Sequence, residues 1–199
     1  WVDKPLWKHG LPSGQEESLT APVALHLPVA LDAAAQVEDA YGEPAMAARW
    51  RERSRESMQA ILRAFYDHDR GCFRDDREGQ TYSEHSQALA LATDSLPDEL
   101  RPGLVAKLAD PPGDWAKATV YFSYHVHEAL LLAGHTTEVF DRFAFWRALP
   151  DQGFHTTVEK PEPSRSDCHG WGAHPLFHCL SAFAGIRPDA PGFARVKIT

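Results

Sequence analysis

The stretch from Trp146 to Pro175 carries side chains of the kinds that bind and cleave polar substrates. It reads WRALPDQGFHTTVEKPEPSRSDCHGWGAHP and combines carboxylates, hydroxyls, arginine, histidine and tryptophan. Long polar loops held between packed helices often carry functional sites. Cleavage of a glycosidic bond needs two carboxylates beside the sugar, one to protonate the leaving oxygen and one to activate water or attack carbon. Glu159 is therefore a candidate for one of these two roles.

The charged and histidine residues of this stretch also have simpler interpretations. Glu159 could be a loop carboxylate that pairs with Lys160 or Arg165, since most acidic side chains are solvated. His174 and His178 are four residues apart on a predicted helix, beside Cys179, but zinc needs further ligands at defined spacing. The sequence contains no HExxH or CxxC motif, so we predict no metal site and interpret these two histidines as packed in the helix.

Hydrophobic periodicity predicts about seven helices joined by loops of uneven length. We expect the first of them to bury a face of leucine and valine residues spaced four apart, namely Leu19, Val23, Leu27 and Leu31. The tail from Phe193 to Ile198 alternates apolar and polar residues, which indicates one short strand whose partners would lie outside this chain. The predicted helices cover residues 18–41, 45–65, 83–93, 97–109, 119–133, 138–149 and 169–184.

Composition excludes some classes of function. The 199 residues are 43% hydrophobic and 24% charged, as in an ordinary globular protein. A formal net charge of −8 disfavours nucleic acid as a partner, and no apolar run is long enough to span a membrane. The three cysteines, none in a CxxC motif, are interpreted as reduced and mostly buried thiols, which favours the cytoplasm.

Several motifs resemble one known family. Glu159 followed by S-D-C-H-G-W-G-A-H-P at residues 166–175 is similar to the glutamate and S-x-C-H-x-W-[SG]-A-x-P pattern of glycoside hydrolase family 78, the bacterial α-L-rhamnosidases. Residues 86–91 resemble its Q-A-L-A-L helix. Trp1-Val2-Asp3 resembles a family loop that reads F-x-D-W, and Lys4 here stands in place of its tryptophan. The resemblance spans nearly the whole chain and is most specific between residues 159 and 175.

This resemblance implies an all-α fold, namely the second half of an α/α six-hairpin barrel. Residues 1–186 would form that part of the barrel, and residues 187–199 would begin a C-terminal β-sandwich. Half a barrel would expose apolar faces through which copies of the chain could associate. It implies no cofactor and no metal.

The resemblance also implies an inverting hydrolase of terminal α-L-rhamnosides with a carbohydrate as its partner. Glu159 would be the general base. The family's general acid lies in an upstream motif that reads roughly R-D-E-R-x-G-W-x-G-D and does not occur here, so we expect this chain to be inactive alone. The residues expected to shape the sugar site are Asp3, Arg165, Asp167, His169 and Trp171.

Two other functions compete with this one. A different six-hairpin glycosidase would share the barrel and the carboxylates but act on another sugar. A noncatalytic carbohydrate-binding helical protein would bind sugar without cleaving it. For Trp171, core packing and contact with sugar are equally favoured; for Trp146, burial is the ordinary outcome.

Overall fold

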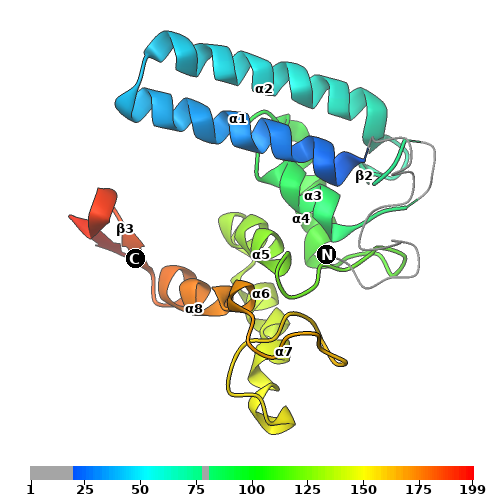
Figure 1. Cartoon of the computed structure of the whole chain (residues 1–199). Helices are drawn as coiled ribbons and strands as arrows, with labels where there is room; N and C mark the ends of the chain where they lie inside the picture. Colours follow the sequence, from blue (N-terminus) through cyan, green and yellow to red (C-terminus); the bar gives the residue numbers. More distant parts are fainter. Residues whose placement is uncertain (1–19, 78–80) are drawn as a thin grey trace. The chain divides into compact units, whose positions relative to one another are not determined.

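A computed structural model describes residues 20–77 and 81–199, so Asp3 and Leu19 lie outside the described residues (Figure 1). The chain divides into two compact units, residues 1–118 and residues 119–199. The described part is mainly helical, with two short two-stranded antiparallel sheets. This confirms the predicted all-α class. The domain boundary predicted at residue 186 stays a prediction.

Unit 1 begins with a helical hairpin formed by α1 (Ala21–Tyr41) and α2 (Pro44–Phe65), which pack side by side in Figure 1. Each has a proline in its first turn, where the missing N–H would have no helical acceptor. The strands β1 (Tyr66–Asp67) and β2 (Cys72–Phe73) follow as a small hairpin. Next come α3 (Glu84–Leu91), the short 3-10 helix η3 (Asp98–Leu100) and α4 (Arg101–Ala109).

The predicted buried face of α1 was wrong. Val23 and Leu27 are 62% and 54% exposed. The helix instead buries a face that mixes alanine, proline, one leucine and one acidic residue. In this face Asp32 accepts a hydrogen bond of 2.9 Å from the backbone N–H of Asp94. A polar residue can lie in this face because that donor replaces water. The buried residues of α1 are Ala21, Pro22, Leu25, Pro28, Asp32 and Ala35.

Every residue of α3 is buried, and polar side chains attach this helix to the strand before it. The amide of Gln87 accepts a hydrogen bond from the Phe73 N–H at 2.9 Å and donates to the Phe73 carbonyl at 2.7 Å. Asp75, which is fully buried, accepts hydrogen bonds from the hydroxyls of Ser83 and Ser86 at 2.7 and 2.6 Å. These contacts explain why polar residues begin a helix that is buried on all sides.

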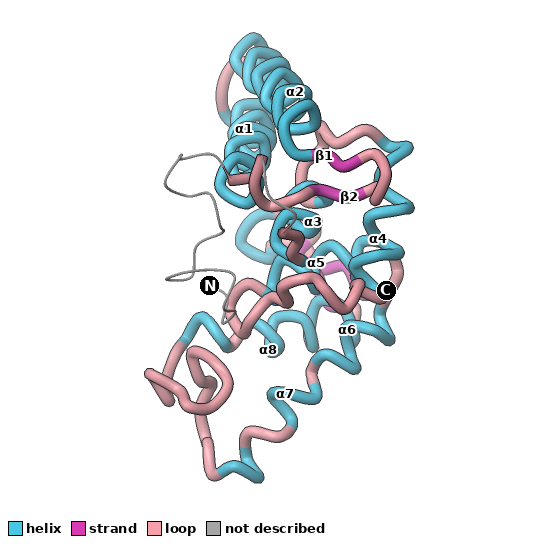
Figure 2. The backbone as a smooth tube through the Cα atoms, turned by 90° about the vertical axis from the view of Figure 1, so that its right-hand side faces the viewer, coloured by secondary structure: helices cyan, strands magenta, loops and turns pink. Residues whose placement is uncertain are grey.

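Unit 2 contains shorter elements and more loop. The helices α5 (Ser123–Leu132), α6 (Thr136–Arg142) and α7 (Ala144–Arg147) precede the 3-10 turn η4 (Pro150–Gln152). Figure 2 shows the long loop between α7 and α8. The chain then forms the 3-10 turn η5 (Gly170–Gly172), α8 (His174–His178) and the π-helix η6 (Cys179–Phe183).

The C-terminal strand has a partner within the chain, contrary to the prediction. β4 (Val196–Ile198) pairs antiparallel with β3 (Ile186–Pro188), and the 3-10 turn η7 (Pro191–Phe193) lies between them. β3 was not predicted because three residues that include a proline carry little alternation of apolar and polar side chains. The C-terminal segment is therefore a β-hairpin.

The cysteines differ from expectation in their exposure. All three are free thiols, as predicted, but only Cys72 is buried, whereas Cys168 and Cys179 are exposed. Burial raises the pKa of the Cys72 thiol to about 11, so this thiol is unreactive at neutral pH. In the part of the chain that the structure describes, no helix is both long enough and apolar enough to cross a membrane.

Candidate functional site

The loop that carries the candidate residues folds back on itself. The Glu159 N–H donates to the Ser166 carbonyl at 2.9 Å, and the His169 N–H donates to the Thr157 carbonyl at 2.7 Å. The Thr157 hydroxyl also donates to the His169 carbonyl, at 2.8 Å. Residues 156–159 and 166–169 thus lie side by side, and we call residues 156–169 the polar hairpin. It brings Glu159 and the motif at residues 166–175 together.

Glu159 is held by an arginine of the same hairpin. Arg165 contacts Oε1 of Glu159 through Nη2 and donates from Nε to Oε2 at 3.2 Å. The Glu159 side chain is 12% exposed, whereas the Arg165 side chain is 72% exposed. Hydrogen bonds from Arg165 hold the pKa of Glu159 below its ordinary value, and the charges of His169 and Lys160 act in the same direction. Glu159 is therefore ionised at neutral pH.

Three aromatic rings lie near one another at the C-terminal end of the polar hairpin. The Trp171 ring lies 5.0 Å from that of Tyr121 and 5.7 Å from that of His169, measured between centroids. Trp171 is 59% exposed, so part of its ring is open to a ligand. Tyr121 was not among the predicted site residues, and its contact with Trp171 joins residues that are far apart in the sequence.

A close backbone approach fixes the end of the motif. A Cβ atom on Gly172 would lie 2.8 Å from the Val158 carbonyl oxygen and 2.9 Å from a methyl group of Val120. The Trp146 indole donates to the Gly172 carbonyl at 2.7 Å. Trp146 therefore has the structural role expected for it, and only glycine fits at position 172 without displacement of its neighbours.

The remaining predicted residues are less closely tied to Glu159. The side chain of Asp167 is exposed, and its backbone carbonyl accepts from the hydroxyl of Thr156. Asp3 falls outside the described residues. Three histidines outside the polar hairpin, His127, His174 and His178, could hold a metal ion. One ring nitrogen of each lies within 4.8 Å of the other two.

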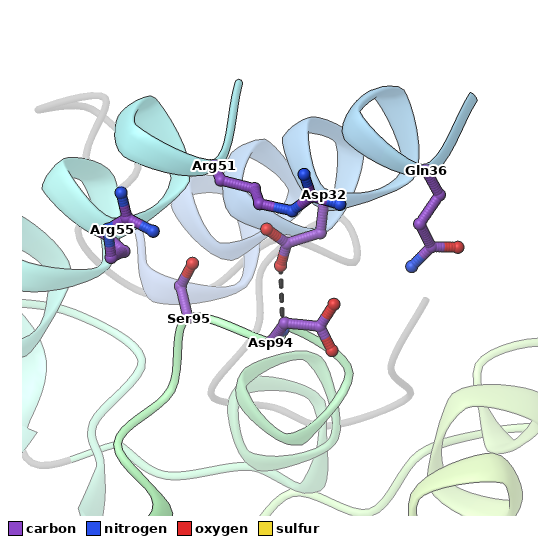
Figure 3. Close-up of a pocket in the computed structure, with 6 residues that line it drawn as sticks. All are labelled: Asp32, Gln36, Arg51, Arg55, Asp94 and Ser95. Atoms are coloured by element: carbon purple, nitrogen blue, oxygen red, sulfur yellow. Dashed lines mark hydrogen bonds between the residues drawn. The ribbon is translucent and has the colours of Figure 1, made fainter. Parts of the chain in front are cut away.

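Unit 1 has a small polar pocket of a different kind (Figure 3). Asp32 points across it and accepts from the Asp94 N–H, while Arg51 forms an ion pair with Asp39. Its carboxylates and guanidinium groups balance in charge, and none of the predicted site residues lines it. We assign it to the packing of α1 and α2 against residues 94 and 95. The lining residues are Asp32, Gln36, Arg51, Arg55, Asp94 and Ser95.

Comparison with known proteins relates the fold to rhamnosidases. A glycoside hydrolase family 78 rhamnosidase of Bacillus sp. GL1 superposes with a TM-score of 0.83 at 22% identity, covering 90% of this chain and 21% of that one. A rhamnosidase from Klebsiella oxytoca, solved with rhamnose bound, superposes with a TM-score of 0.69 at 24% identity, covering 80% and 33%. No protein-family model and no curated protein sequence matches the chain.

The chain thus spans about a fifth and a third of the lengths of these two structures. At 22% and 24% sequence identity, this likeness establishes a shared fold and nothing further. The chain has the fold of one helical segment of these rhamnosidases, which confirms the partial helical fold expected from the motifs. That this segment is half of a six-hairpin barrel stays a prediction.

Proposed function

We propose that this chain is part of a glycoside hydrolase that cleaves terminal α-L-rhamnosides with inversion. The observation that carries the proposal is the polar hairpin, because its ionised and mostly buried Glu159 lies near His169, whose ring contacts the exposed Trp171. The fold likeness to two rhamnosidases supports the same class of reaction.

In this mechanism Glu159 is the general base. An inverting glycosidase uses one carboxylate to deprotonate a water molecule on the far side of the sugar, while a carboxylic acid protonates the leaving oxygen. The base must be ionised before it accepts the proton, and Arg165 maintains that state by holding the pKa of Glu159 low. We expect the acid to come from the upstream motif, so these 199 residues alone would not complete the pair.

The other predicted residues would bind the sugar. The apolar face of a pyranose ring packs against aromatic rings, and Trp171 offers a partly open one. Sugar hydroxyls need charged or polar partners, and Asp167 and Arg165 are both exposed on the polar hairpin. His169 can donate or accept, depending on which ring nitrogen carries the proton. Asp3 remains a proposed hydroxyl ligand on the basis of its motif.

One observation favours a second candidate, a carbohydrate-binding protein without catalysis. Arg165 donates to both carboxylate oxygens of Glu159, which leaves fewer lone pairs for a water molecule. In this alternative Glu159 serves only to position Arg165, and Trp171 and His169 bind a sugar that is not cleaved.

The test compares hydrolysis of aryl α-L-rhamnoside with that of other aryl glycosides. The longest natural polypeptide that contains these residues is assayed beside the 199-residue chain. We expect the longer protein to prefer the rhamnoside and the chain to release no aryl alcohol. Preference for another glycoside would replace rhamnose as the substrate. Binding of L-rhamnose in calorimetry without cleavage by either protein would favour the noncatalytic function.

A further inference from the structure

Three histidines of unit 2 bring their ring nitrogens together inside the unit. His127 belongs to α5, and His174 and His178 lie one turn apart on α8. His127 and His178 are 1% and 0% exposed. The rings of Phe143 and Trp146 lie 5.3 and 6.1 Å from that of His127, between centroids. The cluster is thus enclosed by aromatic side chains and largely shielded from water.

The outer nitrogens of two rings face hydrogen-bond acceptors. Nε2 of His174 lies 3.0 Å from the Val120 carbonyl oxygen, and Nε2 of His178 lies 3.0 Å from Oε1 of Glu128. Carbonyl and carboxylate oxygens only accept. Both Nε2 atoms must therefore carry the hydrogen in these bonds. The Ser123 hydroxyl, 3.1 Å from Nε2 of His174, donates its own hydrogen to the Val120 carbonyl and can also accept.

The inner nitrogens of the same two rings then face each other without a hydrogen. A neutral imidazole carries one N–H, so Nε2–H leaves each Nδ1 as a bare lone pair. The two Nδ1 atoms of His174 and His178 are 3.3 Å apart. Two lone pairs at this separation repel each other unless a cation lies between them, and that cation is either a proton or a metal ion.

The distance between these two atoms fits a metal ion. Zinc binds imidazole nitrogen at about 2.0–2.1 Å with tetrahedral geometry. Two ligand atoms at corners of such a tetrahedron are about 3.3–3.4 Å apart, which follows from that bond length. The Nδ1 atoms of His174 and His178 therefore have the separation of two zinc ligands.

His127 supplies a third nitrogen that lacks another use. Neither of its ring nitrogens has a hydrogen-bond partner among the described residues, and both are buried. A buried polar atom without a partner carries the full cost of losing water.

We propose that His127, His174 and His178 form a binding site for a divalent transition-metal ion of the zinc class. Glu128 and the Val120 carbonyl would orient the ligands from outside, as carboxylates and carbonyls do for metal-bound histidines. A fourth position is left for water or another ligand. Because the site joins α5 to α8, the metal would stabilise unit 2, and this role is independent of the function proposed for Glu159.

The rival explanation is a proton shared between two rings. In that case His178 would be an imidazolium that pairs with Glu128 and donates from Nδ1 to His174. The two explanations differ in the response to added metal, and they also differ in the role of His127, which the shared proton does not need.

The first experiment titrates Zn²⁺ into the chain after treatment with a chelator and dialysis. We expect calorimetry to give one bound ion per chain and the melting temperature to rise, because an ion that binds only the folded state stabilises it. Co²⁺ in place of Zn²⁺ should give the strong visible absorption of a tetrahedral site. No binding, or binding without a rise in melting temperature, would overturn the proposal.

Variants assign the ligands. His127→Phe removes a ligand whose nitrogens have no other partner, so we expect this variant to fold and to lose Zn²⁺ binding by at least tenfold. Glu128→Gln removes the outer carboxylate and should weaken binding by roughly 10–100-fold. His155→Gln, an exposed histidine of the same unit, is the matched control and should bind Zn²⁺ normally. Unchanged affinity in His127→Phe would overturn the assignment.

A spectroscopic measurement avoids dependence on variants. Histidine ring ¹⁵N NMR of the unaltered chain reports which nitrogens carry hydrogen. We expect the Nδ1 resonances of His174 and His178 to shift on addition of Zn²⁺. Nδ1 resonances that show a shared proton both with and without Zn²⁺ would establish the rival explanation.

Discussion

Asp75 in unit 1 and Glu159 in unit 2 are both carboxylates held by hydrogen bonds, but their partners differ. Asp75 is fully buried and accepts from Ser83 and Ser86 on or beside α3, which are themselves buried. Glu159 is 12% exposed, and its partner Arg165 is 72% exposed. A buried partner cannot leave without unfolding, whereas an exposed arginine can exchange with water or substrate. The exposure of the partner therefore distinguishes a structural carboxylate from one available for chemistry.

The largest expected effect is the loss of hydrolytic activity when Glu159, unlike the structural Asp75, is replaced. Glu159→Gln in the longest natural polypeptide should lower kcat by about 10²–10⁴-fold, the usual cost of losing a general base. The measurement is hydrolysis of aryl α-L-rhamnoside at saturating substrate. Glu162→Gln, an exposed glutamate on the tip of the same hairpin, is the control and should retain activity. A fall of less than about tenfold in Glu159→Gln would contradict the general-base role.

The next effect is one of stability. Asp75→Ala leaves two buried hydroxyl donors without their acceptor, and each buried donor left without a partner costs about 1–3 kcal/mol. We expect the free energy of unfolding to fall by at least about 2 kcal/mol, measured by urea denaturation of the chain. Glu159→Gln should change it far less, because an ion pair with an exposed partner adds little. Equal losses in the two variants would remove the distinction between them.

A smaller effect tests what holds the polar hairpin in place. Gly172→Ala brings a methyl group to within 2.8 Å of the Val158 carbonyl oxygen, and overpacking of this kind costs about 1–3 kcal/mol. Gly170→Ala is the matched control, because a Cβ there meets nothing within 4 Å. Denaturation curves for both variants provide the measurement. If Gly172→Ala is as stable as Gly170→Ala, the contact with Val158 does not fix the hairpin.

The sequence predicted the position of α2 closely because both ends are marked and the pattern is regular. It predicted Ala45 to Phe65, and the helix spans Pro44–Phe65. The buried face of α1 was missed because hydrophobicity alone selected Val23 and Leu27. The real face depends on Asp32, whose burial requires a donor from Asp94 that is distant in the sequence.

For the candidate site, as for the helices, the sequence predicted the local features and missed the contacts between distant residues. The motif identified Glu159, His169 and Trp171, and the structure brings them onto or beside one hairpin. The contact of Tyr121 with Trp171 and the approach of His127 to His174 were not predictable, because both join residues dozens of positions apart. Spacing within one helix revealed His174 and His178, but a third ligand from another helix leaves no local pattern.

The smallest expected effect concerns Arg165, and it sharpens the comparison most directly. Removal of the guanidinium in Arg165→Gln lets the pKa of Glu159 rise toward its ordinary value of 4.5. A general base works only when deprotonated, so the acidic limb of the kcat profile should move to higher pH. At neutral pH the carboxylate is ionised in either protein, so kcat should change little, and loss of the proposed contact between Arg165 and the sugar should raise KM instead.

Lys160→Gln is the control for this effect. Lys160 also lowers the pKa of Glu159, but its effect is weaker than that of Arg165, so its removal should shift the profile less than Arg165→Gln does. The pH dependence of kcat in both variants is the measurement. A profile that stays in place in Arg165→Gln would mean that the substrate already displaces the arginine before catalysis. Loss of kcat at all pH values would instead mean that the contact of Arg165 with the sugar is needed in the transition state, and that its ion pair with Glu159 belongs to the free protein only.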